Sequence, residues 1–549
     1  MPKSILRYER FPYALPIISA LLLVITLPPF NLWPLILVAL VPMYFFIYRE
    51  KDTFKIFSGV LFFGFIFSGY LSYITLFSFT WIPEAHLFST TVKVFAIPLV
   101  FFISAATAFG ICLLKTEKEG LVPLERVILF GIFAVVEWAI GNVFIGFNYG
   151  SLAYAASHIS ALRFMASIGG TFLVTFMVVF GNAAIAEALR FIFQTNKRDV
   201  LLLIPLGIFG AVMGASFAYQ YTYPVDSTVT SSISIAVIQD TTRKESEAFG
   251  TIVHGSFQFP LLENRIQEAV LLHPDVIIYP FSPWIGAIGN SLDNHGFTKD
   301  VIGMDFTIFR KWLNVHVPPQ TTLVTWDTHF AGGEYWNEIN FWKNGALIAS
   351  YRKIKLFPFM DYTPQWAQKL GMYSTPYDGT AGTSSSPVNI GKATIGNLVC
   401  SEISRPTSAR ENGKTADVVF AIGSEAMFAN SFPNEFNLLN AQLRATESGR
   451  MIIRANKFGP SALIDSYGNI VKEIPYNQSG ILFVNVPTGK LRGTTLYSTI
   501  TEYPFLILLV GYVLFLWFLG FLWTRKIKRP WFFWFLRLRR LEKPSEIEK

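Results

Sequence analysis

The sequence predicts a helical membrane domain joined to one α/β domain, and three observations lead to this fold class. Charged residues make up only 15% of the 549 residues, whereas soluble domains carry about 25%. Apolar runs long enough to cross a bilayer, which takes about 20 residues, recur through the first 220 positions. Between 232 and 486, β-branched runs alternate with amphipathic segments, a pattern typical of an α/β fold.

The apolar runs predict seven membrane spans before the polar region and one after it. Lys3, Arg7 and Arg10 precede the first span, and the basic cluster 525–529 follows the last. Basic loops of membrane proteins stay in the cytoplasm, so we expect both termini there and the polar region on the periplasmic side. The predicted spans are 12–27, 32–47, 54–77, 92–114, 121–140, 162–191, 200–219 and 504–523.

These spans divide the chain into four parts. We expect a transmembrane domain of about seven helices over 1–220, a periplasmic domain over 221–500, a closing span over 501–526 and a basic cytoplasmic tail over 527–549. The tail combines aromatic and basic residues, which favours a position along the lipid head groups. The net charge of +8 thus reflects membrane topology, and we expect no nucleic-acid partner.

The polar region contains the pattern of one layered α/β domain. An apolar helical face begins at Leu262, and a second helix is predicted over 435–448. The turn sequences Lys343-Asn-Gly345 and Tyr467-Gly-Asn469 indicate hairpins. The scattered histidines and the absence of a phosphate-binding glycine loop predict no metal and no cofactor. The predicted strands are 232–238, 275–279, 322–325, 344–351, 393–399, 418–422, 451–454, 461–465 and 481–486.

Cys400 is the one cysteine of the polar region, and it directly follows the predicted strand 393–399. A thiol at a strand end, with Glu402 two residues later, is a usual presentation of a cysteine nucleophile. The alternative is a small buried hydrophobe, because free cysteines are among the most buried residues. Cys112 lies in an apolar run, and two cysteines form no disulfide framework.

Lysines alternate with apolar residues in the stretch 351–362. If this stretch is a strand, Lys353 and Lys355 point to the same side. A lysine inside a site would stabilise an oxyanion or lower the pKa of a neighbouring thiol. The alternative is a solvated edge strand, where lysines are common.

Several short motifs occur together in this chain. Glu137-Trp138 and the Cys-x-Glu of 400–402 are two of them. The set resembles bacterial apolipoprotein N-acyltransferase, a membrane-embedded family of the nitrilase (carbon-nitrogen hydrolase) superfamily, whose layout of seven spans, a nitrilase domain and a closing span also matches. The other motifs are Pro-Pro-Phe-Asn-Leu-Trp-Pro-Leu at 28–35, Ile-Gly-Gly at 168–170, Tyr-x-Lys-x-x-Leu-x-Pro-Phe at 351–359, Arg-Ala-Thr-Glu-Ser-Gly-Arg at 444–450 and Thr-Leu-Tyr at 495–497.

The resemblance implies a fold, a location and a two-step reaction. The fold is a polytopic α-helical membrane domain plus an α/β nitrilase-like four-layer αββα sandwich, in the bacterial inner membrane. A cysteine thiolate takes an acyl chain from a membrane phospholipid as a thioester. It then passes the chain to the α-amino group of a diacylglyceryl lipoprotein. No cofactor takes part, and we expect a monomer.

The resemblance also assigns roles to four positions. By motif match, Cys400 is the nucleophile and Lys353 is the oxyanion or electrostatic residue. Glu402 matches the second carboxylate, which acts as support or as a surrogate base. Asp361 stands where the family has a supporting glutamate.

The chain departs from the family pattern at the general base. The family's strand ends in Trp-Pro-Glu, with the glutamate as base, whereas this chain reads Tyr-Pro-Phe and places Phe281 there. Phenylalanine cannot accept a proton, which leaves Glu402, Asp361 or Glu425 as surrogate. The family's Asn-Asp-x-Trp-Phe-Gly is also altered, to Gly-Ser-Glu-Ala-Met-Phe at 423–428.

Three functions are compatible with these residues. The first is an N-acyltransferase of this family. The second is a catalytically impaired or inactive homologue that binds lipid or lipoprotein without turnover. The third is a membrane-tethered amide hydrolase, which would release its product to water. A positioned base contributes about 10²–10⁴-fold, and a thiol depends on a base least of all nucleophiles. The retained Lys353, Cys400 and Glu402 therefore favour the acyltransferase.

Overall fold

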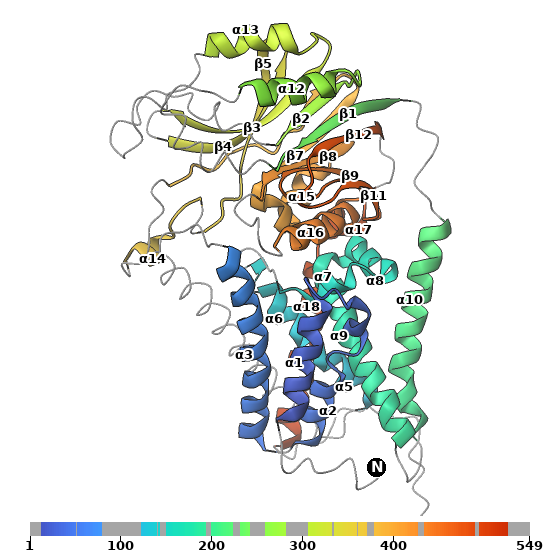
Figure 1. The fold of residues 1–549 in the computed structure, drawn as a ribbon. Helices are drawn as coiled ribbons and strands as arrows, with labels where there is room; N and C mark the ends of the chain where they lie inside the picture. Colours follow the sequence, from blue (N-terminus) through green and yellow to red (C-terminus); the bar gives the residue numbers. More distant parts are fainter. Residues whose placement is uncertain are drawn as a thin grey trace, which may run out of the picture.

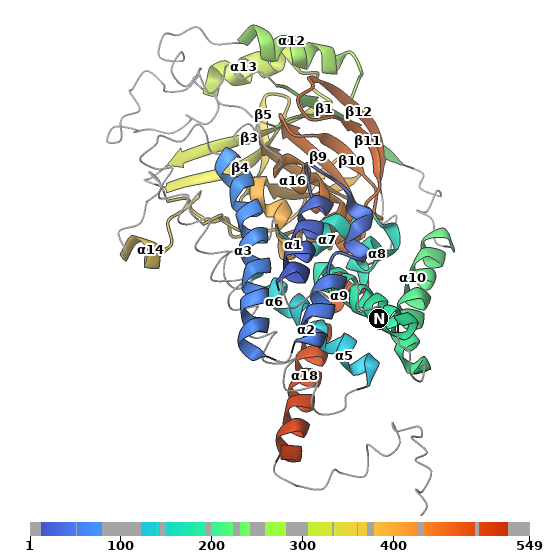
Figure 2. The same cartoon turned by 60° about the horizontal axis from the view of Figure 1, so that its bottom comes forward.

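The computed structural model stacks a two-sheet sandwich on one end of a bundle of apolar helices (Figure 1). The same two parts are seen after a 60° turn (Figure 2). The structure describes residues 13–50, 52–78, 122–139, 141–142, 150–193, 199–222, 231–241, 259–280, 306–331, 334–358, 361–369, 378–425, 433–488 and 494–524.

Apolar helices make up the bundle. Among the described residues, three are long and apolar enough to cross a membrane: Thr53–Leu71, Ala166–Phe193 and Val200–Gln220. Helix α9 lies at the centre, where it contacts most of the other helices of the bundle. The elements are α1 (Ala14–Thr26), η3 (Trp33–Leu37), α2 (Val41–Arg49), α3 (Thr53–Ser78), α5 (Pro123–Phe130), α6 (Ile132–Ala139), α7 (Leu152–Ala156), α8 (Ser160–Phe164), α9 (Ala166–Phe193), η5 (Val200–Leu203), α10 (Ile204–Thr222) and α18 (Tyr503–Thr524).

Three predicted spans are interrupted in the structure. The span 32–47 is the 3-10 turn η3 followed by α2, and each piece has a proline in its first turn, where a missing N–H costs nothing. The span 121–140 is broken between α5 and α6 at Gly131, whose added Cβ would lie 2.5 Å from the Phe176 ring. The span 162–191 begins as the separate helix α8. The predicted span 92–114 lies outside the described residues.

The polar region folds into two six-stranded sheets, in the orders β12-β1-β2-β3-β4-β5 and β11-β10-β9-β8-β7-β6. Buried isoleucine and valine side chains from both sheets form the core between them. The strands are β1 (Ser232–Gln239), β2 (Val276–Tyr279), β3 (Thr322–Ala331), β4 (Glu334–Lys343), β5 (Ala346–Arg352), β6 (Val388–Ile390), β7 (Ala393–Val399), β8 (Val418–Ser424), β9 (Met451–Lys457), β10 (Ser461–Ile464), β11 (Ile470–Ile474) and β12 (Gly480–Pro487).

Helices cover the outer faces of both sheets, so the predicted αββα sandwich is confirmed. Apolar residues of α12 (Phe259–Val270) and α13 (Phe306–His316) pack on the first sheet. Residues of α15 (Pro406–Gly413) and α16 (Pro433–Ser448) pack on the second. Helix α16 also contacts α7, α8 and α9, so this layer lies between the sandwich and the bundle (Figure 1).

Every strand and helix predicted in the polar region is present, and both predicted hairpins are confirmed. Asn344 and Gly345 adopt positive φ between β4 and β5, and Gly468 does so between β10 and β11. The sequence pattern does not predict β4, β6, β11, α13, α14 (Gln365–Lys369), α15 or α17 (Leu496–Ile500). Strand β4 is not predicted because aromatic residues lie on both of its faces, so its sequence lacks the apolar–polar alternation of a half-buried strand.

Candidate active site

Cys400 lies at the carboxyl end of β7, as the sequence predicts, and begins the 3-10 turn η8 (Cys400–Ser404). Its φ of +51° is in the left-handed region, which costs a non-glycine residue about 1–2 kcal/mol. The neighbouring strand β8 reaches this point with Gly423, whose added Cβ would lie 3.3 Å from the Cys400 Cα. The small residue therefore lets two parallel strand ends meet beside the thiol.

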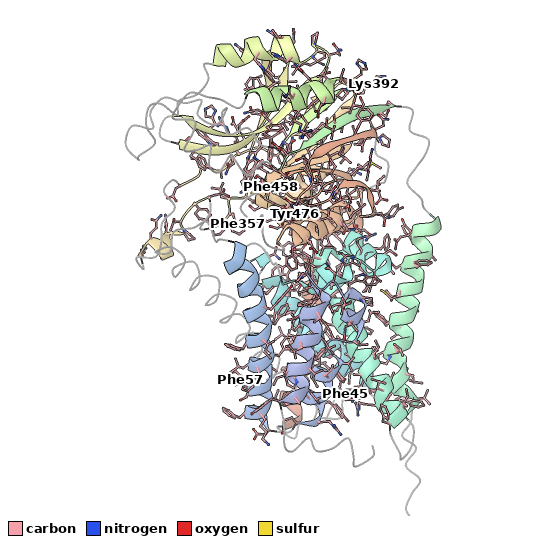
Figure 3. The ribbon with its side chains drawn as sticks, in the orientation of Figure 1. Phe45, Phe57, Phe357, Lys392, Phe458 and Tyr476 are labelled. Carbon is pink, nitrogen blue, oxygen red and sulfur yellow. The ribbon has the colours of Figure 1, made fainter. Side chains whose placement is uncertain are left out.

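Lys353 is buried, with only 1% of its surface exposed, and its Nζ lies 2.5 Å from Asp361 Oδ2. The Phe357 N–H donates to the same oxygen at 2.7 Å. Phe357 lies on the side of the sandwich that faces the membrane helices (Figure 3). Asn337 Nδ2 donates to Oδ1 at 3.0 Å. This lysine is thus an internal ammonium with a fixed counter-ion, and the edge-strand alternative is excluded for it.

A strand that continues over 353–355 is wrong, because β5 ends at Arg352. The N–H groups of Ile354 and Lys355 leave the ladder and donate to Glu402 Oε1 at 2.9 and 3.0 Å. A buried carboxylate replaces the neighbouring strand as their acceptor. Lys353 and Lys355 consequently differ in environment: the first is buried and the second is partly exposed.

The charges around the thiol oppose one another. Burial raises the pKa of the Cys400 thiol, and Lys353 acts against this while Asp361 adds to it. Burial also opposes the charge of Lys353, but Asp361 and Cys400 more than offset it, so the pKa of Lys353 is raised. At neutral pH the resting pair is therefore a thiol beside an ammonium ion. Activation of the thiol requires that its proton be removed.

Two family models match the chain: the apolipoprotein N-acyltransferase N-terminal domain over 19–184 and carbon-nitrogen hydrolase over 295–495. Apolipoprotein N-acyltransferase of Aquifex aeolicus is 25% identical over 61% of this chain and 70% of its own length. That of Rhizobium meliloti is 24% identical over 67% of this chain and 68% of its own length. The chain belongs to the apolipoprotein N-acyltransferase family.

A further relative with the same name, from Pseudomonas aeruginosa, is 33% identical over 31% of this chain and 34% of its own length. Among solved structures, an amidase from Nesterenkonia sp. is similar at 17% identity. Its TM-score is 0.33, and the match covers 49% of this chain and 95% of that chain. A structural similarity with this TM-score carries no argument about the function of this chain. The two family models by themselves agree with the two-part architecture of this family member.

Glu402 is fully buried and accepts four donors. Besides Ile354 and Lys355, the Val399 N–H donates to Oε2 at 2.9 Å and the Tyr351 hydroxyl at 3.1 Å. Burial raises the pKa of Glu402, and the backbone donors act against this. Its side chain ties the turn that carries Cys400 to the end of β5, which carries Lys353. This arrangement suits a positioning carboxylate and leaves little acceptor capacity for a proton from the thiol.

Glu402→Gln is expected to lower the free energy of unfolding by about 2–4 kcal/mol, because an amide NH₂ would face backbone donors in a buried site. Chemical unfolding in lipid nanodiscs measures this change. The control is Glu268→Gln on α12, whose carboxylate is half exposed; we expect a change within about 0.5 kcal/mol there. Equal effects of the two substitutions would contradict the positioning role.

The remaining carboxylate candidate, Glu425, has partners of its own. It is buried and forms an ion pair with Arg454, and the side-chain amides of Asn437 and Asn456 donate to its Oε1 at 2.9 and 3.2 Å. Burial raises its pKa, and Arg454 acts against this. Its charge contributes to the raised pKa of Cys400. Phe281, which the motif match places at the family's base position, lies outside the described residues.

Three residues that hold this site together were not predicted from the sequence. Asn337 orients Asp361, and its backbone oxygen accepts the Lys353 N–H at 2.8 Å. Tyr351 donates to Glu402, although its place in the family motif suggested no role. Arg405 donates to the Leu356 oxygen at 3.0 Å. Asn337 was not recognisable because β4 was not predicted, although Ile339 and Phe341 share its face at a period of two.

Proposed function

We propose that this protein transfers an acyl chain from a membrane phospholipid to the N-terminal amine of a diacylglyceryl lipoprotein, through a thioester on Cys400. The observation that carries the proposal is the buried Lys353–Asp361 pair within electrostatic reach of a cysteine held at a strand end. The printed name of the relatives, apolipoprotein N-acyltransferase, supports the same reaction.

The proposed roles follow from charge and position. In the first step the Cys400 sulfur bonds to the ester carbonyl carbon, the ester C–O bond breaks, and the thiol proton ends on the lysophospholipid hydroxyl. In the second step the lipoprotein amine bonds to the same carbon, the C–S bond breaks, and an amine proton returns to the sulfur. Each tetrahedral intermediate carries an oxyanion, which Lys353 stabilises. Asp361 holds Lys353, and Glu402 holds the turn.

The proposal includes a location. Basic clusters on one side of the predicted spans favour the bacterial inner membrane with the sandwich on the periplasmic side, where lipoprotein N-termini and outer-leaflet lipids meet it. We propose the membrane part over 1–220, the sandwich over 221–500 and the closing span over 501–526. The reaction needs one copy of each site residue, so a monomer suffices.

The test is direct detection of the acyl-enzyme. The protein in nanodiscs is incubated with phospholipid that carries a labelled acyl chain, and Cys400 is isolated on its peptide. We expect a label that neutral hydroxylamine removes and that Cys400→Ala abolishes, while Cys112→Ala leaves it in place. No label in protein that is folded by circular dichroism would overturn the transferase proposal and favour the inactive homologue. Release of free fatty acid without an amine acceptor would favour the hydrolase.

A further inference from the structure

Membrane helix α9 contains a break next to the sandwich. Gly169 and Gly170 leave the helical conformation, with φ and ψ of −136° and 25° and of 67° and −170°. A Cβ on Gly170 would lie 2.5 Å from the Tyr497 ring. Both the positive φ and this contact therefore require glycine. The regular helix restarts at Thr171, and the first N–H groups of a helix need partners from outside it.

A carboxylate of the sandwich caps this internal helix start. The backbone N–H and the hydroxyl of Thr171 donate to Glu447 Oε1 at 2.9 and 2.6 Å. Glu447 is fully buried on α16, the helix that covers the second sheet of the sandwich. A negative charge at a helix N-terminus is stabilised by the unpaired N–H groups and by the helix dipole. The polar region therefore completes a helix of the membrane part.

Arg444, one turn earlier on α16, connects this cap to the turn of Cys400. Its Nη2 donates to Glu447 Oε1 at 2.9 Å and to the Thr171 hydroxyl oxygen at 2.5 Å. Its Nε lies 2.8 Å from Glu447 Oε2, an ionic contact whose N–H does not point at that oxygen. Its Nη1 lies 3.5 Å from the carbonyl oxygen of Ser404, the last residue of η8.

The turn needs support from both sides. Cys400 has a left-handed φ, and such a conformation persists only where its surroundings enforce it. Glu402 holds the turn on the side of Lys353. On the opposite side, the Ser404 hydroxyl donates to the Ser401 oxygen at 2.7 Å, and the Ser404 carbonyl meets Arg444. Helix α16 contacts both η8 and α9. It lies above α9 in Figure 1 and in Figure 2.

We propose that Thr171, Arg444 and Glu447, which we call the α9 joint, position the Cys400 turn, so that a membrane helix holds the nucleophile in its reactive conformation. This inference rests on the proposed role of Cys400 as nucleophile. Thr171 is then a positioning residue for acyl transfer, although it belongs to the membrane helix and the thiol to the sandwich. Loss of its hydroxyl removes one donor from Glu447 and one acceptor from Arg444.

The test compares two isosteric substitutions on the same helix. Thr171→Val removes the hydroxyl of the α9 joint and keeps the backbone cap. Thr175→Val, one turn further along, removes another buried threonine–carboxylate bond, to Glu137 at 2.6 Å, which does not lead to the Cys400 turn. The readout is the rate of Cys400 alkylation by iodoacetamide from pH 6 to 10, quantified on its peptide by mass spectrometry. This readout needs no acyl transfer.

We expect Thr171→Val to lower the alkylation rate at pH 7 about fivefold to tenfold and to move its midpoint to higher pH, because the thiol moves away from Lys353. Thr171→Ser restores the hydroxyl and should react at the wild-type rate, and Thr175→Val should match the wild type. An unchanged or faster alkylation rate in Thr171→Val, or the same loss of rate in Thr175→Val, would overturn the proposed positioning role of the α9 joint. Failure of the transferase proposal appears instead as the missing thioester in the wild type.

Discussion

Replacing Lys353 with methionine is expected to lower the rate of thioester formation on Cys400 by about 10³-fold or more. The substitution removes the ammonium that would face the oxyanion, and loss of one such group costs about 10²–10³ in rate. It also removes the charge that acts against burial at the thiol, so the thiolate fraction falls further. Single-turnover labelling with phospholipid in nanodiscs measures the rate.

Lys355→Met is the matched control for this substitution. Lys355 is two residues away and partly exposed, and only its backbone N–H serves the site, so we expect a rate within about twofold of the wild type. The pH dependence provides a second readout. Since Lys353 lowers the thiol pKa, its loss should move the midpoint of Cys400 alkylation to higher pH. An unchanged midpoint in Lys353→Met would show that this ammonium does not act on the thiol.

Phe281→Glu is expected to raise the rate of thioester formation by about 10²–10⁴-fold, the usual contribution of a positioned base. By motif match the family has a glutamate at this position, and the described carboxylates near the thiol are engaged by other partners. Glu402 accepts four donors and Asp361 is paired with Lys353. Glu425 is paired with Arg454. The added carboxylate would take the thiol proton, so the gain should be largest below the pKa of Cys400, which burial raises.

Phe281→Gln separates the base from a change of shape. Glutamine has the same length as glutamate and cannot accept a proton at neutral pH, so we expect no comparable gain from it. The same single-turnover assay compares the two variants across pH 6 to 9. If Phe281→Glu is no faster than Phe281→Gln, the site has been rebuilt around phenylalanine and works without a base at this position.

Much of the fold follows from local pattern. Strands with a largely apolar run, such as β8, are predictable because buried parallel strands are apolar on both faces. The interrupted membrane helices are not, since apolar composition is the same for a straight and a broken helix. The breaks at Gly131 and Gly170 depend on close packing against the rings of Phe176 and Tyr497, which lie far away in the sequence.

The candidate site is likewise predictable from the sequence in part only. Motif match in the sequence is enough to predict its reactive groups, because Cys400, Lys353 and Glu402 follow the family pattern and Phe281 does not. The burial and the hydrogen-bond partners of each group are visible only in the tertiary structure. Lys353 is a buried ammonium paired with Asp361, whereas Lys355 is partly exposed. Glu402 accepts hydrogen bonds from four donors. The Thr171 N–H also donates to Glu447, which lies 276 positions later in the chain. Burial and hydrogen-bond partners come from contacts between distant segments, which spacing along the chain does not encode.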